Sequence, residues 1–402
     1  MDAILLEWGS LLLRWVHIIT GIAWIGSSFY FMHIDASLKA TPSIAKGGET
    51  WEVHGGGFYH VRKYLVAPDA LPDQLIWHKW ESYATWVSGF FLLVWVYYLG
   101  SDLYLIDPAV RVLSPWAAAA IGTGGLALGW IVYDLLCKSP LANNEIALAV
   151  VGFAFIMAMA FGFQQVFSGR GALIHTGALM GTIMSGNVFA NIIPNQKKVI
   201  ADLVAGRTPN PDFGRQAKTR SRHNNYLTLP VLFLMLSSHY PLTYASPYAW
   251  VMVGFILVAG ALVRHFYNER HAGRGDQWWT WGAAALCMAA AVLISMLAAP
   301  AGRERLGLKA VRPARVVSAV RVPKEVDDII TSRCSMCHAR EPVYLGIAVA
   351  PKGVLLDSAA QIARQGDAIR MHTVLTHAMP PNNITHMTTD ERRVLAVWLG
   401  RR

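Results

Sequence analysis

Five residues near the end of the chain have the types and spacing that attach a c-type haem. Cys334-Ser335-Met336-Cys337-His338 reads C-x-x-C-H, in which two thiols add to the haem vinyl groups and the histidine binds iron. A zinc site is the alternative, but zinc would need two further Cys or His ligands at matching spacing. The two other cysteines, Cys137 and Cys287, lie far upstream in apolar stretches. The pattern therefore predicts one covalent haem c and an electron carrier.

The second axial ligand is expected to be a methionine some tens of residues further on. Met379 precedes two prolines, which stiffen a loop that can present its sulfur to the iron. Met371 and Met387 are rival ligands, and bis-histidine ligation is a further alternative. The histidines that could provide it are His372, His377 and His386. His/Met ligation raises the reduction potential of a haem, so His338 and Met379 would suit an electron acceptor.

The residues around these ligands predict a small helical domain from about 325 to 402. Val326, Ile329 and Ile330 form an apolar face before the first cysteine, and Thr388 to Glu391 fits a capping box. This box opens a final helix with four large apolar residues. They are Leu395, Val397, Trp398 and Leu399. The Met-Pro-Pro loop resembles that of small class I cytochromes c, and the segment is long enough to be one.

The rest of the chain has the composition of a membrane protein. Hydrophobic residues make up 54% of the sequence and charged residues only 15%, which is unusual for a soluble domain. Eight stretches are apolar over the roughly 20 residues that span a bilayer. They are 8–33, 80–100, 113–136, 145–167, 171–193, 225–244, 248–267 and 277–299, the sixth interrupted by Pro230 and Pro241.

These patterns predict an all-α chain with three parts. Residues 1–300 would form a transmembrane helix bundle of about eight spans, 301–324 a basic linker and 325–402 a class I cytochrome c domain. The linker holds seven basic residues, which fits a solvated tether or a strap on anionic lipid. The net charge of +10 does not indicate nucleic acid binding, because membrane topology and this linker account for most of the basic residues.

Two independent arguments give one orientation in the membrane. Haem c is attached outside the cytoplasm, so the C-terminal domain and, with eight spans, the N-terminus should lie outside. The loops then expected inside are 34–79, 137–144, 194–224 and 268–276. They carry most of the bundle's Lys and Arg, whereas the short outer loops carry only Arg111 and Arg170, as the positive-inside rule requires. The start of the chain lacks a basic signal segment, so the first span should be retained.

Ionisable residues inside spans are costly and usually functional. Arg14 and His17 share one face of the first span, where they could be interfacial and structural, contact a substrate or bind a metal. His239 in the sixth span lies at a depth similar to that of His17. His17 and His239 are therefore candidate ligands of a second, b-type haem or another metal.

Two further groups are candidate substrate contacts. Asn187, Asn191 and Asn195 follow at i, i+4 and i+8 in the fifth span, where amides can grip a polar ring or cross-link helices. His54 begins a His-Gly-Gly-Gly-Phe-Tyr run in the first inner loop. Its glycines expose backbone amides, so this run could bind a flat organic anion or be a plain flexible loop.

Three motifs and the domain order resemble the bacterial membrane-bound urate hydroxylase (urate oxidase) family. The motifs are the runs 14–31, 53–59 and 187–196. The resemblance covers essentially the full chain and implies a multi-pass protein of the inner membrane with both termini periplasmic. It also implies a reaction: urate and water give 5-hydroxyisourate, two protons and two electrons. The electrons would pass through haem c to a soluble periplasmic cytochrome c and a terminal oxidase, without direct use of dioxygen.

Urate is planar and anionic, so arginine, histidine and asparagine are suitable contacts. The expected catalytic residues are Arg14, His17, Asn187, Asn191 and His54, with His17 or His54 as the base. A site at the glycine run would put about 30 Å of hydrocarbon between substrate and haem. A buried site near Arg14 avoids this, and we favour it, with a second iron centre nearby. The alternative function is a membrane-anchored protein that takes electrons from quinol or a partner and has no organic substrate.

Overall fold

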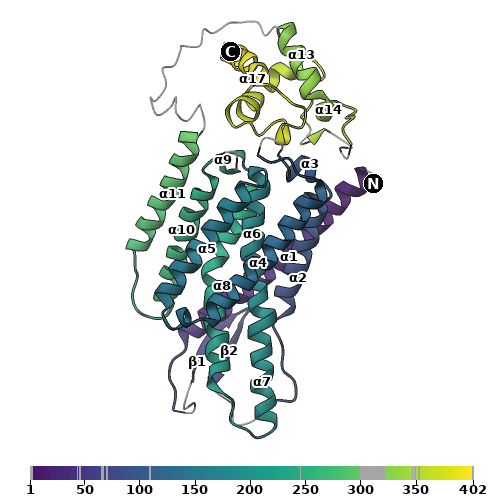
Figure 1. Ribbon diagram of the computed structural model, residues 1–402. Coiled ribbons are helices and arrows are strands. Elements are labelled where there is room, and N and C mark those ends of the chain that lie inside the picture. The colour runs from purple at the N-terminus through teal and green to yellow at the C-terminus, as the bar shows by residue number, and fades with distance from the viewer. Residues whose placement is uncertain are drawn as a thin grey trace.

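The computed structural model describes residues 3–42, 44, 47–64, 68, 71–107, 110–244, 246–298, 322–345, 347, 350–351 and 354–400. These residues are mostly helical, and they form a long helix bundle with a small helical domain at one end (Figure 1). We name the two ends of the bundle the domain end, beside the C-terminal domain, and the hairpin end opposite it. Most of the predicted linker, 301–321, lies outside the described residues.

The bundle contains a helix at each of the eight predicted spans. The elements are α1 (Ala3–Ser37), α2 (Trp80–Leu93) with its π-helical continuation η1 (Val94–Tyr98), α3 (Ser101–Tyr104), α4 (Pro115–Lys138), the 3₁₀ turn η2 (Pro140–Asn143), α5 (Glu145–Gln164), α6 (Gly169–Gly186), the π-helical η3 (Asn187–Ile192), α7 (Ile193–Val204), α8 (Pro211–Ser237), α9 (Pro241–Tyr244), α10 (Ala249–His271) and α11 (Trp279–Ala298). Helices start where a side chain can accept the first free N–H groups: Asn144 caps α5 and Asn210 caps α8, as expected of asparagine.

Five helices are long and apolar enough to cross a membrane. Within the described residues these are Trp8–Ser37, Pro115–Lys138, Glu145–Gln164, Ala249–His271 and Trp279–Leu297. The other predicted spans fall on α2 with η1, α6 with η3, and α8. In α6 and α8 polar side chains such as His175 and Asn225 are fully buried by neighbouring helices, so these two helices need not be apolar.

The sixth predicted span, 225–244, falls on the second half of α8 and on α9. Helix α8 begins at Pro211 and ends at Ser237, so it also includes the polar residues before this span. Pro230 does not end the helix. It lies against Gly260 of α10, where a Cβ would come within 2.6 Å of the proline ring, so the two helices approach closely at this point.

The prediction of an all-α chain is wrong in one segment. Strands β1 (Gly47–His54) and β2 (Gly57–Tyr64) form an antiparallel hairpin at the hairpin end. Gly55 and Gly56 have φ of 58° and 81°, the conformation that a two-residue hairpin turn requires. Tyr30 of α1 donates a 2.7 Å hydrogen bond to the Glu52 carboxylate, which ties the hairpin to the bundle.

The C-terminal domain agrees with the predicted elements. It contains α13 (Lys324–Arg333), α14 (Ser335–His338), α15 (Ala359–Arg364), α16 (Gly366–Ile369), the π-helical η5 (Arg370–Leu375), the 3₁₀ turn η6 (Pro381–Asn383) and α17 (Thr389–Leu399). The capping box of Thr388 and Glu391 is present. Of the apolar residues of α17, Leu395, Trp398 and Leu399 are buried in the domain core, whereas Val397 is 49% exposed.

The C-terminal domain faces the bundle with the loop that follows Met379. Asn382 of η6 donates a 3.5 Å hydrogen bond to the backbone oxygen of Asp102 in α3. Figure 1 shows this loop as the part of the domain that reaches down to the bundle, with α13 on the far side.

Candidate functional site

The C-x-x-C-H motif lies where α13 turns into α14. Cys337 is buried and Cys334 is half-buried, and burial raises the pKa of Cys334 to about 12, so its side chain is a neutral thiol. The His338 Nδ1 lies 3.0 Å from the Val354 backbone oxygen. A histidine that donates from Nδ1 in this way presents Nε2 as a fixed ligand, which is the usual arrangement of a metal-binding histidine.

Met379 is held by Arg392 of α17. The buried guanidinium donates from Nη1 to the backbone oxygen of Met379 at 2.9 Å and to that of Thr373, and from Nη2 to the Asn383 side chain at 3.1 Å. Of the rival methionines, Met387 is packed in the domain core and Met371 is 39% exposed. The supported loop therefore favours Met379 as the sulfur ligand.

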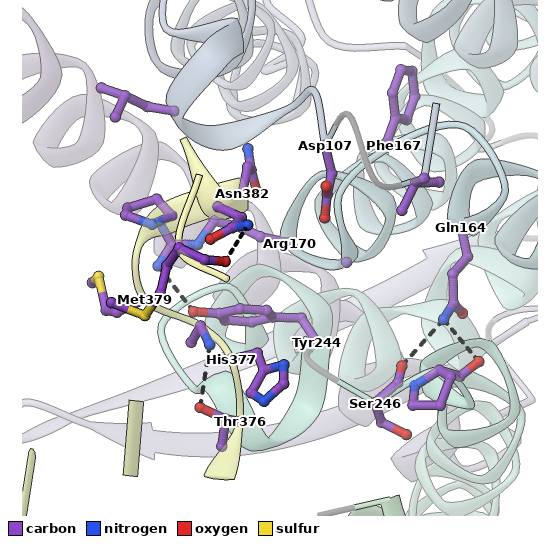
Figure 2. Close-up of a pocket in the computed structure, with 18 of the residues that line it drawn as sticks. Asp107, Gln164, Phe167, Arg170, Tyr244, Ser246, Thr376, His377, Met379 and Asn382 are labelled. Carbon is purple, nitrogen blue, oxygen red and sulfur yellow. Dashed lines mark hydrogen bonds between the residues drawn. The ribbon is translucent and has the colours of Figure 1, made fainter. Parts of the chain in front are cut away.

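A pocket of about 700 Å³ separates the Met379 loop from the bundle (Figure 2). Arg170 of α6 lies between two tyrosines, with its guanidinium carbon 5.4 Å from the Tyr104 ring centroid and 5.2 Å from that of Tyr244. Its Nε is buried and makes no hydrogen bond to the described residues. On the domain side His377 lines the pocket, and burial together with the charge of Arg392 lowers its pKa, so this histidine is neutral at pH 7.

A buried polar network crosses the hairpin-end half of the bundle. Arg220 of α8 is 4% exposed and forms a 2.7 Å ion pair with Asp134 of α4. The same guanidinium donates to Asn187 Oδ1 at 3.0 Å. Asn187 in turn donates to Tyr133 and to Asn224 at 3.0 and 2.9 Å. The Arg220 charge is thus balanced by the Asp134 carboxylate, and both the oxygen and the nitrogen of the Asn187 amide are hydrogen-bonded.

Two of the three predicted amides cross-link helices. Asn187 bonds to Asn224 and Arg220 of α8, and Asn195 donates to Gln216 of α8 at 3.2 Å. Asn187 and Asn191 lie in the π-helical η3, whose turns hold more residues than α turns. Asn191 Oδ1 is buried and makes no hydrogen bond within the described part of the chain.

The bundle has a second buried arginine, Arg264 of α10, and no carboxylate among the described residues forms an ion pair with it. Its Nε donates to Asn225 Oδ1 at 3.2 Å and its Nη2 to Asn268 Oδ1 at 3.5 Å. Its guanidinium carbon lies 4.0 Å from the ring centroid of Phe29 in α1. Asn225 is 0% exposed, and its Nδ2 has no hydrogen-bond acceptor among the described residues.

The other predicted site residues lie in separate surroundings. Arg14 Nη1 is 3.5 Å from His239 Nε2, so this ring nitrogen faces a cation. His17 Nδ1 is 3.0 Å from the Thr85 backbone oxygen on α2. His54 is exposed and ends strand β1 at the hairpin turn, whereas Arg14 lies in the first half of α1. The structure therefore does not gather the five predicted catalytic residues, and the described chain contains no cluster of three His, Cys, Asp or Glu that could hold a metal.

Sequence reasoning missed Arg220, Arg264 and Asn225 as candidate site residues. Arg220 was counted among the loop charges, because the polar half of α8 was read as loop. The signal that could have found it is the run from Arg220 to Asn225, where two arginines, a histidine and two amides directly precede an apolar stretch.

The structure thus defines a class: a helical bundle, able by length and composition to cross a membrane, with buried charged networks and a C-terminal domain that carries C-x-x-C-H. The model of the family described as urate oxidase N-terminal matches residues 3–295, and the chain belongs to this family. Membership indicates an oxidoreductase and a urate-related oxidation. Neither the curated proteins nor the solved structures contain a match. The matched residues cover the helix bundle and end before the C-terminal domain.

Proposed function

We propose that the bundle oxidises urate in a membrane and that the C-terminal domain accepts the electrons through a covalent haem c. Urate and water would give 5-hydroxyisourate, two protons and two electrons, with the oxygen taken from water. The electrons would leave to a soluble cytochrome c and a terminal oxidase. The observation that carries the proposal is a urate oxidase family match that ends where a domain with C-x-x-C-H and a supported methionine begins.

The residues of the C-terminal domain fit a haem c. Cys334 and Cys337 would hold the porphyrin, His338 Nε2 and Met379 would bind the iron, and Val354 would orient the histidine. When bound, the haem supplies a one-electron acceptor, so each urate needs two transfers. The Met379 loop faces the bundle across the pocket of Figure 2, and Asn382 of the same loop contacts Asp102 of α3.

We further propose that the helices at the eight predicted spans cross the bacterial inner membrane, with the domain end of the bundle on the periplasmic side. The five apolar helices support a membrane location. At the hairpin end lie cations such as Lys63, Lys138 and Arg215, as expected for a cytoplasmic side. The second haem predicted for His17 and His239 stays a prediction.

Anaerobic addition of urate to the purified full-length protein is expected to reduce haem c, followed by its visible absorption. Two haems should be reduced per urate consumed, because the oxidation releases two electrons. The second candidate function, a quinol-linked electron carrier, is favoured by the C-x-x-C-H domain alone. Reduction by quinol but not by urate would establish that function and exclude ours.

Replacing Arg392 by alanine is expected to free Met379 from its support. The substitution removes three hydrogen bonds, two of them to backbone oxygens of the loop. We expect loss of the long-wavelength band of methionine-ligated ferric haem and a lower reduction potential, while the covalent haem is retained. Arg393→Ala is the control, since that neighbour forms only an exposed ion pair with Asp390. An unchanged band in Arg392→Ala would contradict the role of the clamp.

A further inference from the structure

Arg264 brings a positive charge into the bundle that no described carboxylate balances. Two buried arginines occur in the described part of the bundle, and the other, Arg220, is paired with Asp134 at 2.7 Å. Arg264 is 7% exposed, so it faces the protein interior and not the lipid. A buried charge without a counter-charge is costly, and removing the partner of a buried pair is strongly destabilising for that reason. Its neighbours provide only neutral amide oxygens.

Asn225 adds, at the same place, a buried hydrogen-bond donor that has no acceptor among the described residues. Its Oδ1 accepts from both Arg264 and Asn268, at 3.2 Å each. Its Nδ2 then points elsewhere, is fully buried and donates to no described residue. Buried amide donors nearly always have an acceptor, so an orphaned one marks a place where a partner binds. Beside this amide donor lies the Arg264 guanidinium, which can only donate hydrogen bonds and has no carboxylate partner among the described residues. The missing partner is therefore an acceptor, and a negatively charged one.

From these contacts we infer that Arg264, Asn225 and Phe29 form the seat of the urate anion, an inference that rests on the proposed function. Urate carries a deprotonated ring nitrogen next to carbonyl oxygens, so one edge of the molecule offers adjacent acceptors to the guanidinium and the amide. Charge-assisted pairs of this kind are the stronger hydrogen bonds of binding sites. Phe29 already covers one face of the guanidinium at 4.0 Å, which excludes water from that side. Arg264 and Asn225 would bind and orient the substrate, and they have no role in proton transfer.

The position of the seat agrees with the family match and defines a transfer distance. Phe29, Asn225 and Arg264 all lie within the matched residues 3–295. Arg264 is 15 residues from Ala249 at the domain end of α10, which corresponds to about 22 Å along the helix axis. Electrons from this depth must cross most of the bundle to reach the C-terminal domain.

Two substitutions separate a binding seat from a structural cross-link. Asn225→Asp keeps the size of the side chain, removes the orphaned donor and gives Arg264 a carboxylate. Arg264→Gln removes the charge and retains amide hydrogen bonding. Urate binding is measured on full-length protein whose haem has been reduced with ascorbate under nitrogen, so that bound urate cannot react. We expect both variants to bind urate at least about tenfold more weakly than the wild type, the cost of one lost charge-assisted hydrogen bond.

The control and the opposing outcomes are distinct. Arg270→Gln is the control variant. It removes an exposed cation of α10 that forms an ion pair with Asp276, and this variant should bind urate as tightly as the wild type does. Wild-type urate binding in both variants would overturn the seat and leave the proposed function standing. A wild-type protein that urate neither binds nor reduces would overturn the function itself. A further outcome would assign the charge to a lipid headgroup and also overturn the seat. In that outcome phosphatidylglycerol nanodiscs stabilise the wild type and urate does not, and the Arg264→Gln variant loses the stabilisation by the lipid.

Discussion

Replacing Cys334 and Cys337 together by alanine is expected to abolish urate-dependent electron transfer. Without the two thiols no thioether can form, so the porphyrin should be lost on denaturing gels and in acidic acetone. Turnover with a soluble cytochrome c as acceptor should fall to the background rate, because the substituted chain lacks its electron acceptor. Urate should still bind with its normal affinity, since we propose that its site lies in the bundle, within the residues that the family model matches.

Cys287→Ala is the matched control for this experiment. Cys287 lies in α11, away from the motif, and is a free thiol. Its variant should keep the haem and full activity. Persistent urate oxidation with the soluble cytochrome in the double Cys→Ala protein would show that electrons leave the bundle by another route.

Removing the Asp134 carboxylate is expected to be the most destabilising single substitution in the bundle. Asp134→Ala leaves Arg220 buried, 4% exposed and without its 2.7 Å counter-charge. Breaking a buried ion pair from one side costs about 3–5 kcal/mol of unfolding free energy, mainly because of the uncompensated charge. The measurement is reversible unfolding of the detergent-solubilised protein, with the haem-domain signal recorded separately.

A double substitution and a surface control test the cause of this loss. Asp134→Ala with Arg220→Met removes both charges, so it should recover much of the lost stability. Lys138 also pairs with Asp134, but the Lys138 side chain is 64% exposed. Lys138→Ala should therefore change the free energy of unfolding by less than about 1 kcal/mol. If the double variant were no more stable than Asp134→Ala alone, the buried charge would not be the cause.

The sequence predicted the helices and the haem motif because both depend on local signals. Apolar runs located a helix at each expected span, and C-x-x-C-H with Met379 identified the C-terminal domain as a haem candidate without any tertiary information. The hairpin was missed because His54 to Gly57 was taken as a ligand loop, whereas the positive φ of Gly55 and Gly56 makes it a turn. A ligand-binding loop and a hairpin turn both require the conformational freedom of glycine, so the sequence alone could not distinguish these two structures.

The candidate site could be predicted only in part, because burial and pairing depend on the tertiary fold. Arg220 and Arg264 are equivalent in sequence, each a cation near the end of an apolar stretch. Only the structure shows that Asp134 of α4 pairs with Arg220 and that, in the part of the chain it describes, no carboxylate pairs with Arg264. Asn187 illustrates the same limit, since its place in an i, i+4 series suggested a ligand contact while its hydrogen bonds go to Arg220, Tyr133 and Asn224.

The π-helical segment η3 affects how distant relatives should be aligned with this chain. Its wider turns hold extra chain length compared with a regular helix over Asn187–Ile192. A relative that runs straight from α6 into α7 would therefore be one residue shorter there, and the gap belongs inside the helix. Placing that gap in the loop between Ala205 and Asn210 would pair every residue of α7 with the wrong counterpart.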